Sequence, residues 1–222
     1  MQTYTWGLPT RIFHFSLVIF IIVAWISADD DYLQLHSAFG YAIGVLIVFR
    51  LIWGLIGPKY SNFRDFNFSI KKAIDFSKNV LSHNNEKHLG HNPAAALVLF
   101  TLLIVIFIVV ITGVLTLGAQ DAKGVFSSLN STFFKELELF EELHEITANI
   151  MLAFIAMHLA GLLTDWVLHR KDETLKSILT GYKRIDGQGA KINIFQSIIA
   201  IIFFILTALT FYFTFANISY FY

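Results

Sequence analysis

Residues 142–169 read ELHEITANIMLAFIAMHLAGLLTDWVLH, a long apolar run that carries histidines at 144 and 158. The spacing of fourteen residues corresponds to about 21 Å along a helix axis and returns to within about 40° of the same face. One helix would therefore present two imidazoles on nearly one stripe, one near each membrane surface. Because an imidazole inside hydrocarbon is costly and usually functional, the pair predicts a site. Its separation suits two stacked haem groups, each taking one ligand from this helix and one from elsewhere.

The composition indicates a membrane protein. The chain has 222 residues, of which 56% are hydrophobic and 14% are charged, and its mean hydropathy is +0.64. A net charge of zero favours no nucleic-acid partner. The absence of cysteine excludes disulfides, thiolate zinc sites, covalently attached c-type haem and cysteine-held iron–sulfur clusters in this chain. Histidine is left as the main candidate for a metal ligand.

Five apolar runs are long enough to cross a bilayer, which predicts an all-α membrane protein: 8–28, 33–56, 93–117, 142–168 and 192–216. A signal peptide is the alternative for the first run, but Ile26-Ser27-Ala28 is a poor cleavage site, so we expect a retained helix. Residues 66–81 have apolar positions at helical spacing among lysines, which predicts an amphipathic helix at the headgroups.

The distribution of basic residues predicts the orientation. Fourteen of the 16 Lys and Arg residues fall at Arg11, in 50–92 or in 170–191, and the other two are Lys123 and Lys135. Because short loops rich in Lys and Arg stay cytoplasmic, we expect the N-terminus on the cytoplasmic side of the membrane and the C-terminus on the opposite side.

Depth then sorts the four intramembrane histidines into two pairs. On this topology His14 and His158 lie in the cytoplasmic half, whereas His36 and His144 lie in the external half. Each pair would ligate one haem iron axially, giving six-coordinate centres that pass electrons. A lone histidine near a helix end is as often only hydrogen-bonded to a carbonyl, but four at two matched depths favour ligation.

Other side chains are weaker candidates for contact with the cofactor. Arg11, Arg50 and Arg64 lie at the cytoplasmic level and suit haem propionates, although ordinary positive-inside anchoring explains them equally well. His91 could cap the third span or touch a propionate, whereas His83, His88 and His169 are expected at the solvated surface. Gly40 and Gly44 allow either close helix approach or room for a flat porphyrin.

Several segments resemble the prokaryotic cytochrome b561 and nickel–iron hydrogenase b-type cytochrome family. They are Trp6 with Arg11-Ile-Phe-His14, His36-Ser-Ala-Phe-Gly-Tyr41, Arg50-Leu-Ile-Trp-Gly54 followed by Gly57-Pro58, Gly90-His91-Asn92-Pro93, and Leu143-His144-Glu145 with His158. The resemblance runs from about Trp6 to the segment Thr180-Gly181-Tyr182-Lys183 and implies a four-helix di-haem core, which we place at 1–184. It leaves 185–222, with the fifth span, as an addition that replaces lipid contacts, forms a homodimer interface or docks a partner.

The resemblance also implies the function. Family members exchange electrons between the quinone pool and a partner, such as a periplasmic hydrogenase or another dehydrogenase, a cytochrome c, or a small redox substrate. We therefore expect two haem b groups, a diffusible quinone and a periplasmic or membrane redox partner, whether the chain acts alone or as a subunit of a quinone-linked oxidoreductase. No spacing singles out a quinone site, for which Tyr41, Asp165 and Arg64 are polar candidates. The alternatives are a histidine-relay proton channel or transporter, and a membrane anchor without redox chemistry.

Overall fold

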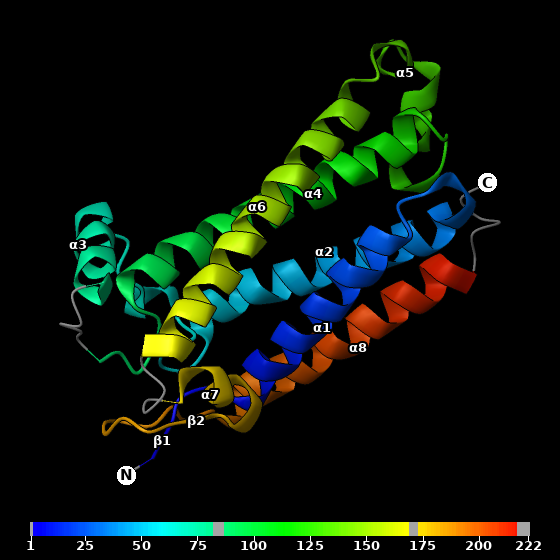
Figure 1. The fold of residues 1–222 in the computed structure, drawn as a ribbon. Coiled ribbons are helices and arrows are strands. Elements are labelled where there is room, and N and C mark those ends of the chain that lie inside the picture. Colours follow the sequence, from blue (N-terminus) through cyan, green and yellow to red (C-terminus); the bar gives the residue numbers. More distant parts are fainter. Residues whose placement is uncertain (1, 82–86, 169–172, 217–222) are drawn as a thin grey trace. The chain divides into compact units, whose positions relative to one another are not determined.

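The computed structural model describes residues 2–81, 87–168 and 173–216. Within those residues, five helices are long and apolar enough to span a membrane: α1 (Leu8–Ile26), α2 (Leu33–Ile56, preceded by the 3-10 turn η1, Asp30–Tyr32), α4 (Pro93–Ala119), α6 (Leu139–Leu168) and α8 (Ile194–Ala216). Figure 1 traces them along the chain together with the shorter elements. These are β1 (Thr3–Tyr4), η2 (Phe63–Asp65), α3 (Ile70–Leu81), η3 (Gly124–Ser131), α5 (Phe134–Leu137), α7 (Thr174–Thr180) and β2 (Tyr182–Lys183). The prediction of an all-α membrane fold is confirmed.

The helix ends differ from the expected ones by a few residues, and local hydrogen bonds explain the differences. Helix α1 ends two residues early, where the Ser27 hydroxyl donates to the Val23 carbonyl at 2.7 Å. Helix α4 continues to Ala119, whose carbonyl accepts from the Asn130 side chain at 2.8 Å. Helix α6 begins three residues early, directly after Glu138, whose backbone is left-handed.

The N-termini of the later helices are capped by side chains. The Asn92 side chain accepts from Ala95 N at 2.8 Å, with Pro93 at the first helical position, where no hydrogen bond is lost. Asn193 and Gln196 form a reciprocal capping box that starts α8 at Ile194 rather than 192. Helix α3 begins at residue 70, four residues later than expected, where the Ser69 hydroxyl accepts from Lys72 N.

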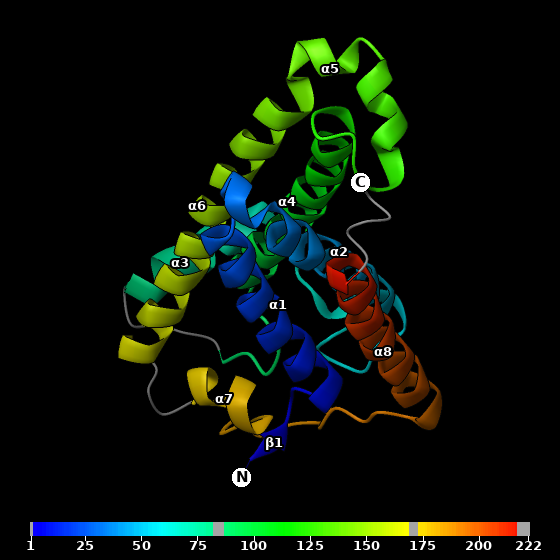
Figure 2. The same cartoon turned by 90° about the vertical axis from the view of Figure 1, so that its right-hand side faces the viewer.

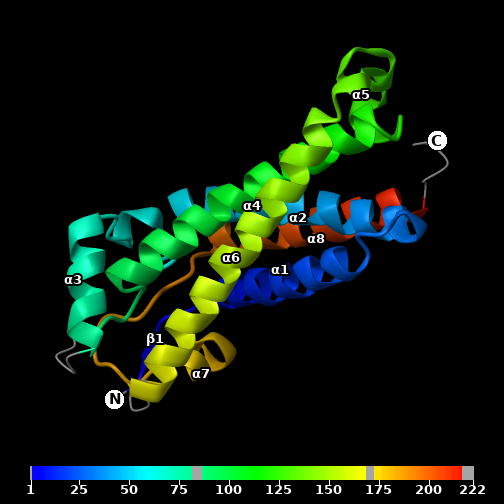
Figure 3. The same ribbon diagram turned by 45° about the horizontal axis from the view of Figure 1, so that its top comes forward.

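The chain divides into two compact units. Unit 1 comprises Met1–His14, Arg50–Leu102 and Ala153–Ile199, and unit 2 comprises Phe15–Phe49, Leu103–Leu152 and Ala200–Tyr222. In unit 1, α3 lies beside the first turns of α4 (Figures 1 and 3). The Gln196 side chain of α8 donates to the Ile56 carbonyl at the end of α2 at 2.7 Å.

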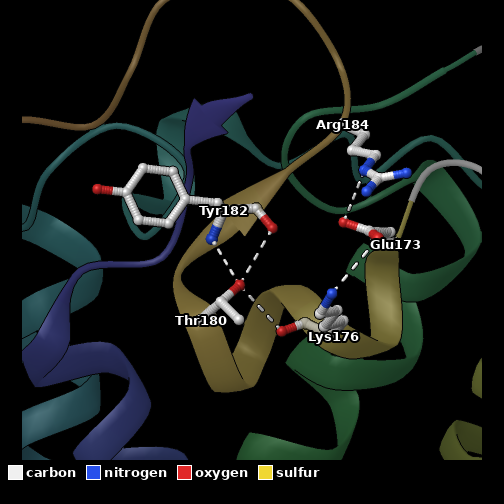
Figure 4. A network of polar contacts seen from close by, with 5 residues as sticks. All are labelled: Glu173, Lys176, Thr180, Tyr182 and Arg184. Atoms are coloured by element: carbon white, nitrogen blue, oxygen red, sulfur yellow. Dashed lines mark hydrogen bonds and ion pairs between the residues drawn. The ribbon is translucent and has the colours of Figure 1, made fainter. Parts of the chain in front are cut away.

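A short antiparallel pair of strands ties the N-terminus of unit 1 to residues after α7, and the sequence did not predict it. Thr3 pairs with Lys183 and Tyr4 with Tyr182, and α7 lies close to β1 (Figure 2). Gly181 has a φ of +89°, and a Cβ there would lie 2.7 Å from the Tyr4 ring, so only glycine fits. Figure 4 shows the polar contacts of this region, including ion pairs of Glu173 with Arg184 at 3.1 Å and with Lys176 at 3.5 Å.

In unit 2, α8 packs against α2 through aromatic rings. The ring centroids of Phe39 and Phe211 are 4.7 Å apart, and those of Phe49 and Phe204 are 5.1 Å apart. The Gln34 side chain also donates to the Phe215 carbonyl at 2.6 Å. These contacts hold the additional helix along the helix that carries His36.

Candidate functional site

His36 and His144 face each other in unit 2. His36 is in the first turn of α2 and His144 is in the second turn of α6. Their ring centroids are 5.9 Å apart and the ring planes are perpendicular, at 90°. The structure therefore brings together the two external histidines that were paired from their expected depth.

The hydrogen bond of His36 determines which of its ring nitrogens has a lone pair available to bind a metal. Its Nδ1 is 2.8 Å from the Ala24 carbonyl, and because a carbonyl only accepts, Nδ1 carries the proton. The Ala24 carbonyl accepts no backbone N–H from Ala28, because α1 ends here and Ala28 N turns instead to Trp25 O. Besides His36, it is approached by the Ser27 hydroxyl at 3.3 Å. A neutral His36 therefore keeps its lone pair on Nε2.

His144 is held in the same way by α4. Its Nδ1 donates to the Val109 carbonyl at 3.0 Å, and the Thr112 hydroxyl oxygen lies 3.3 Å from the same nitrogen. The ring lies against Gly113, where a Cβ would be only 2.8 Å from His144 Cε1. Like His36, a neutral His144 therefore has its Nε2 lone pair available to a metal.

This donor set fits a metal held by two axial imidazoles. Metal–nitrogen bonds of about 2 Å place the centroids of two opposed rings about 6 Å apart, close to the spacing of His36 and His144. A Nδ1–H bound to a carbonyl is the usual support of a metal-ligating histidine. One turn along α2 from His36, a Cβ added to Gly40 would meet nothing within 4 Å, so there is open space beside this helix. The residues present thus fit a haem iron.

The second pair of histidines lies in unit 1. His14 and His158 are close enough that a charge on one acts on the other, and both act on His91. The ring of His91 packs between Trp6 and Phe66, with centroids at 4.8 and 4.7 Å. Unit 1 therefore gathers three imidazoles on a framework of aromatic rings.

Three side chains of unit 1 have buried nitrogen atoms that lack a hydrogen-bond partner among the described residues. Among the described residues, Arg11 Nε, Arg50 Nη1 and His91 Nδ1 are buried atoms with no hydrogen-bond acceptor. The Arg50 guanidinium lies over the Phe63 ring, 4.7 Å from its centroid, and Arg11 also donates to the Leu179 carbonyl. Buried N–H groups without acceptors are costly, so each guanidinium fits an added anionic group such as a carboxylate. Arg50 lies close enough to His91 for its charge to act on the imidazole.

His91 is neutral in this setting. His91 as a whole is partly exposed, whereas its Nδ1 atom is buried. Burial lowers the pKa of His91 to about 3, and the cations of Arg50 and Lys183 act in the same direction. The prediction that His91 caps the third span is wrong, because the neighbouring Asn92 provides the cap.

The remaining predicted residues are placed differently. Arg64 is exposed, whereas Arg11, Arg50 and His91 each have a buried nitrogen atom. Gly44 allows close approach of α4, since its Cβ would lie 3.1 Å from Val110 Cγ1. His88 contacts the Phe76 ring at 5.5 Å, and His83 and His169 fall outside the described residues.

Sequence reasoning missed the contribution of α4. Thr112 and Gly113 contact His144, yet they read as ordinary members of an apolar span. The sequence did contain one signal, the small residue Gly113 within the third apolar span. On the expected topology Gly113 lies in the same half of the membrane as His144. The sequence does not show which helices are neighbours, so Gly113 could not be assigned to His144 from the sequence alone.

An all-α, multi-pass membrane protein with paired histidines between its helices is the class that the fold and these sites define. The chain belongs to the prokaryotic cytochrome b561 family, whose family model matches residues 5–181. Neither a curated protein nor a solved structure matches it. Family membership makes the chain a transmembrane electron-transfer protein with b-type haem, as the sequence predicted. Helix α8 lies outside the matched residues.

Proposed function

We propose that this protein is a di-haem cytochrome that carries electrons across the membrane between the quinone pool and a partner redox protein. The observation that carries the proposal is the pair His36 and His144, whose Nδ1 atoms are both bound to carbonyls and whose Nε2 lone pairs are therefore available. His14 and His158 form the second ligand pair, so residues 1–184 hold both haems. When bound, haem b supplies one-electron chemistry at its iron.

Buried cations anchor the cofactor in unit 1. Arg11 Nε and Arg50 Nη1 would donate to propionate oxygens, which would satisfy two buried N–H groups that lack acceptors among the described residues, and His91 would add a third donor in the tautomer protonated at Nδ1. Arg64 is a further cation at the surface of unit 1. In unit 2, Gly40 would keep a side chain away from the porphyrin face, whereas Gly44 serves the close approach of α4.

Haem content tests the ligand assignment. A pyridine haemochrome assay should give about two haems per chain, and His36→Ala or His144→Ala should each leave one and remove the same optical component. His14→Ala or His158→Ala should remove the other component. His88→Ala, which changes a histidine outside both pairs, should retain both haems. Haem near zero in the unaltered protein would refute the proposal and favour a proton channel or a simple anchor.

The quinone site is a cavity in unit 2. It has a volume of about 440 Å³ and is walled by α2, α4 and α8, a size within the range of small-molecule sites. Its lining is apolar except for the hydroxyls of Tyr41 and Thr210. Such a lining suits a neutral ring with carbonyl oxygens and a long apolar tail. The role proposed for α8 is therefore to form one wall of this partly open cavity, in preference to a homodimer contact or a docking site.

Filling the cavity tests the quinone site. Leu206 lines it, whereas its neighbour Ile205 does not, and the two side chains are similarly exposed at 45% and 54%. Leu206→Trp should slow haem reduction by a soluble quinol analogue at least tenfold, with dithionite reduction unchanged. Ile205→Trp is the matched control and should behave like the unaltered protein. Equal rates for both variants would exclude this cavity.

The charge of one end of unit 2 favours a basic protein partner. Segments 27–32 and 119–145 carry nine carboxylates against Lys123 and Lys135. Burial and the nearby Asp30 raise the pKa of Asp121, as expected where acidic groups crowd together. With the Lys- and Arg-rich segments cytoplasmic, this acidic end faces the periplasm and attracts a lysine-rich electron-transfer protein such as a cytochrome c.

Ionic strength tests the choice of partner. Electron exchange with a lysine-rich cytochrome c should slow as salt is raised from about 10 to 200 mM, because screening weakens the attraction. Asp30→Lys should slow the exchange at low salt and flatten its salt dependence. A rate that rises with salt would point instead to an acidic partner or a small anion.

A further inference from the structure

Helix α4 carries no histidine within its span, yet it makes most of the polar contacts of His144. The Val109 carbonyl accepts from Nδ1 at 3.0 Å, and the Thr112 oxygen lies 3.3 Å from the same atom. Gly113 lies directly against the ring. All of these groups belong to unit 2.

Gly113 makes the Val109 carbonyl accessible. In an α-helix the side chain of residue i+4 leans toward the N-terminus and covers the carbonyl of residue i. At Gly113 this cover is absent, and the imidazole takes its place: an added Cβ would lie 2.8 Å from Cε1 and 3.1 Å from Nδ1 of His144. An alanine at this position would therefore push the ring away from its acceptor.

Thr112 adds a second acceptor for the same N–H. Because Nδ1 donates to the Val109 carbonyl, the Thr112 oxygen can only accept from it. The hydroxyl proton of Thr112 is directed to the Ile108 carbonyl at 2.9 Å or the Val109 carbonyl at 3.0 Å. Thr112 is only 6% exposed, so water does not compete for these bonds.

We propose that Thr112 and Gly113 are positioning residues that set the orientation and the donor strength of His144 toward iron. Acceptors on Nδ1–H raise the basicity of a ligating imidazole, which favours the ferric state and lowers the reduction potential. The inference rests on the proposed function, because it requires His144 to be an axial ligand. On this proposal, α4 controls the reduction potential of the haem held by His144 and not that of the other haem.

Separate redox titration of the two haems tests the role of Thr112. Thr112→Val keeps the shape of the side chain but removes the acceptor. The reduction potential of one haem, the one that is lost in His144→Ala, should therefore rise, while the potential of the second haem should stay unchanged. Thr112→Ser keeps the hydroxyl and should restore the original potential. Thr116→Val is the matched control, since the Thr116 hydroxyl bonds only within α4, to the Thr112 carbonyl at 2.9 Å. It should leave both potentials unchanged.

Gly113→Ala tests the orientation of the ring. Its electron paramagnetic resonance spectrum should show a shifted low-spin signal for the same haem, or loss of that haem with the other retained. Two haems with unchanged potentials in Thr112→Val would overturn the inference while leaving the proposed function intact. An unaltered protein without haem would instead refute the proposed function itself.

Discussion

Ser177→Ala should destabilise unit 1 by removing the acceptor of a buried indole. Trp6 Nε1 donates to Ser177 Oγ at 3.0 Å, and the two residues are 7% and 0% exposed. Ser177 Oγ donates its own proton to the Thr174 carbonyl, so its oxygen accepts from Trp6. Leaving a buried donor unsatisfied costs about 2 kcal/mol, which corresponds to a fall of about 4–8 °C in thermal midpoint for a chain of this size.

Thermal unfolding in detergent, followed by circular dichroism, measures this effect. Ser197→Ala is the control, because among the described residues its hydroxyl bonds only locally, to the carbonyl of Asn193 just before α8, and its thermal midpoint should stay within about 1 °C of that of the unaltered protein. Trp6→Phe removes the donor, so the double variant should cost about 1 kcal/mol less than the sum of the two single changes. A Ser177→Ala midpoint equal to that of the unaltered protein, or strict additivity, would refute the reasoning.

Three further outcomes are expected. In haem-depleted protein the pKa of His91 is about 3 in the folded state and about 6.5 in the unfolded state. The neutral form of His91 therefore contributes to the stability of the folded state at neutral pH, and this contribution is lost as pH falls below about 6.5. At pH 5 this loss is about 2 kcal/mol, and His91→Gln should remove that part of the curve of thermal midpoint against pH. Gly40→Leu, which fills open space beside α2, should lower the haem count from two to one without loss of the helical signal. Gly54→Ala should lower the thermal midpoint, since its Cβ would overlap the Phe63 ring beneath Arg50 and overpacking costs about 1–3 kcal/mol.

The pairing of His36 with His144 could be predicted because it depends only on periodicity and loop charge. The spacing between His144 and His158, together with the distribution of Lys and Arg, sorts the histidines by depth before any helix packing is known. The family assignment followed from the same residues and is confirmed. The role of the four histidines as haem ligands stays a prediction.

Other parts of the site depend on contacts between helices that periodicity does not encode. The bond from His144 to the Val109 carbonyl requires α4 and α6 to be neighbours at one register. The helix ends likewise depend on remote groups, as where Asn130 prolongs α4 to Ala119. The pairing of β1 with β2 joins strands of two residues each, too short for an alternating pattern to appear.

That strand pair has a consequence for how the protein is made. Thr3 and Tyr4 are translated before α1, but their partners Tyr182 and Lys183 are translated only after α6 and α7. The N-terminal tail therefore waits unpaired while four helices enter the bilayer, and its capture by the late segment closes unit 1. Synthesis halted before residue 182 would yield inserted helices with this end still open to proteases on its side of the membrane.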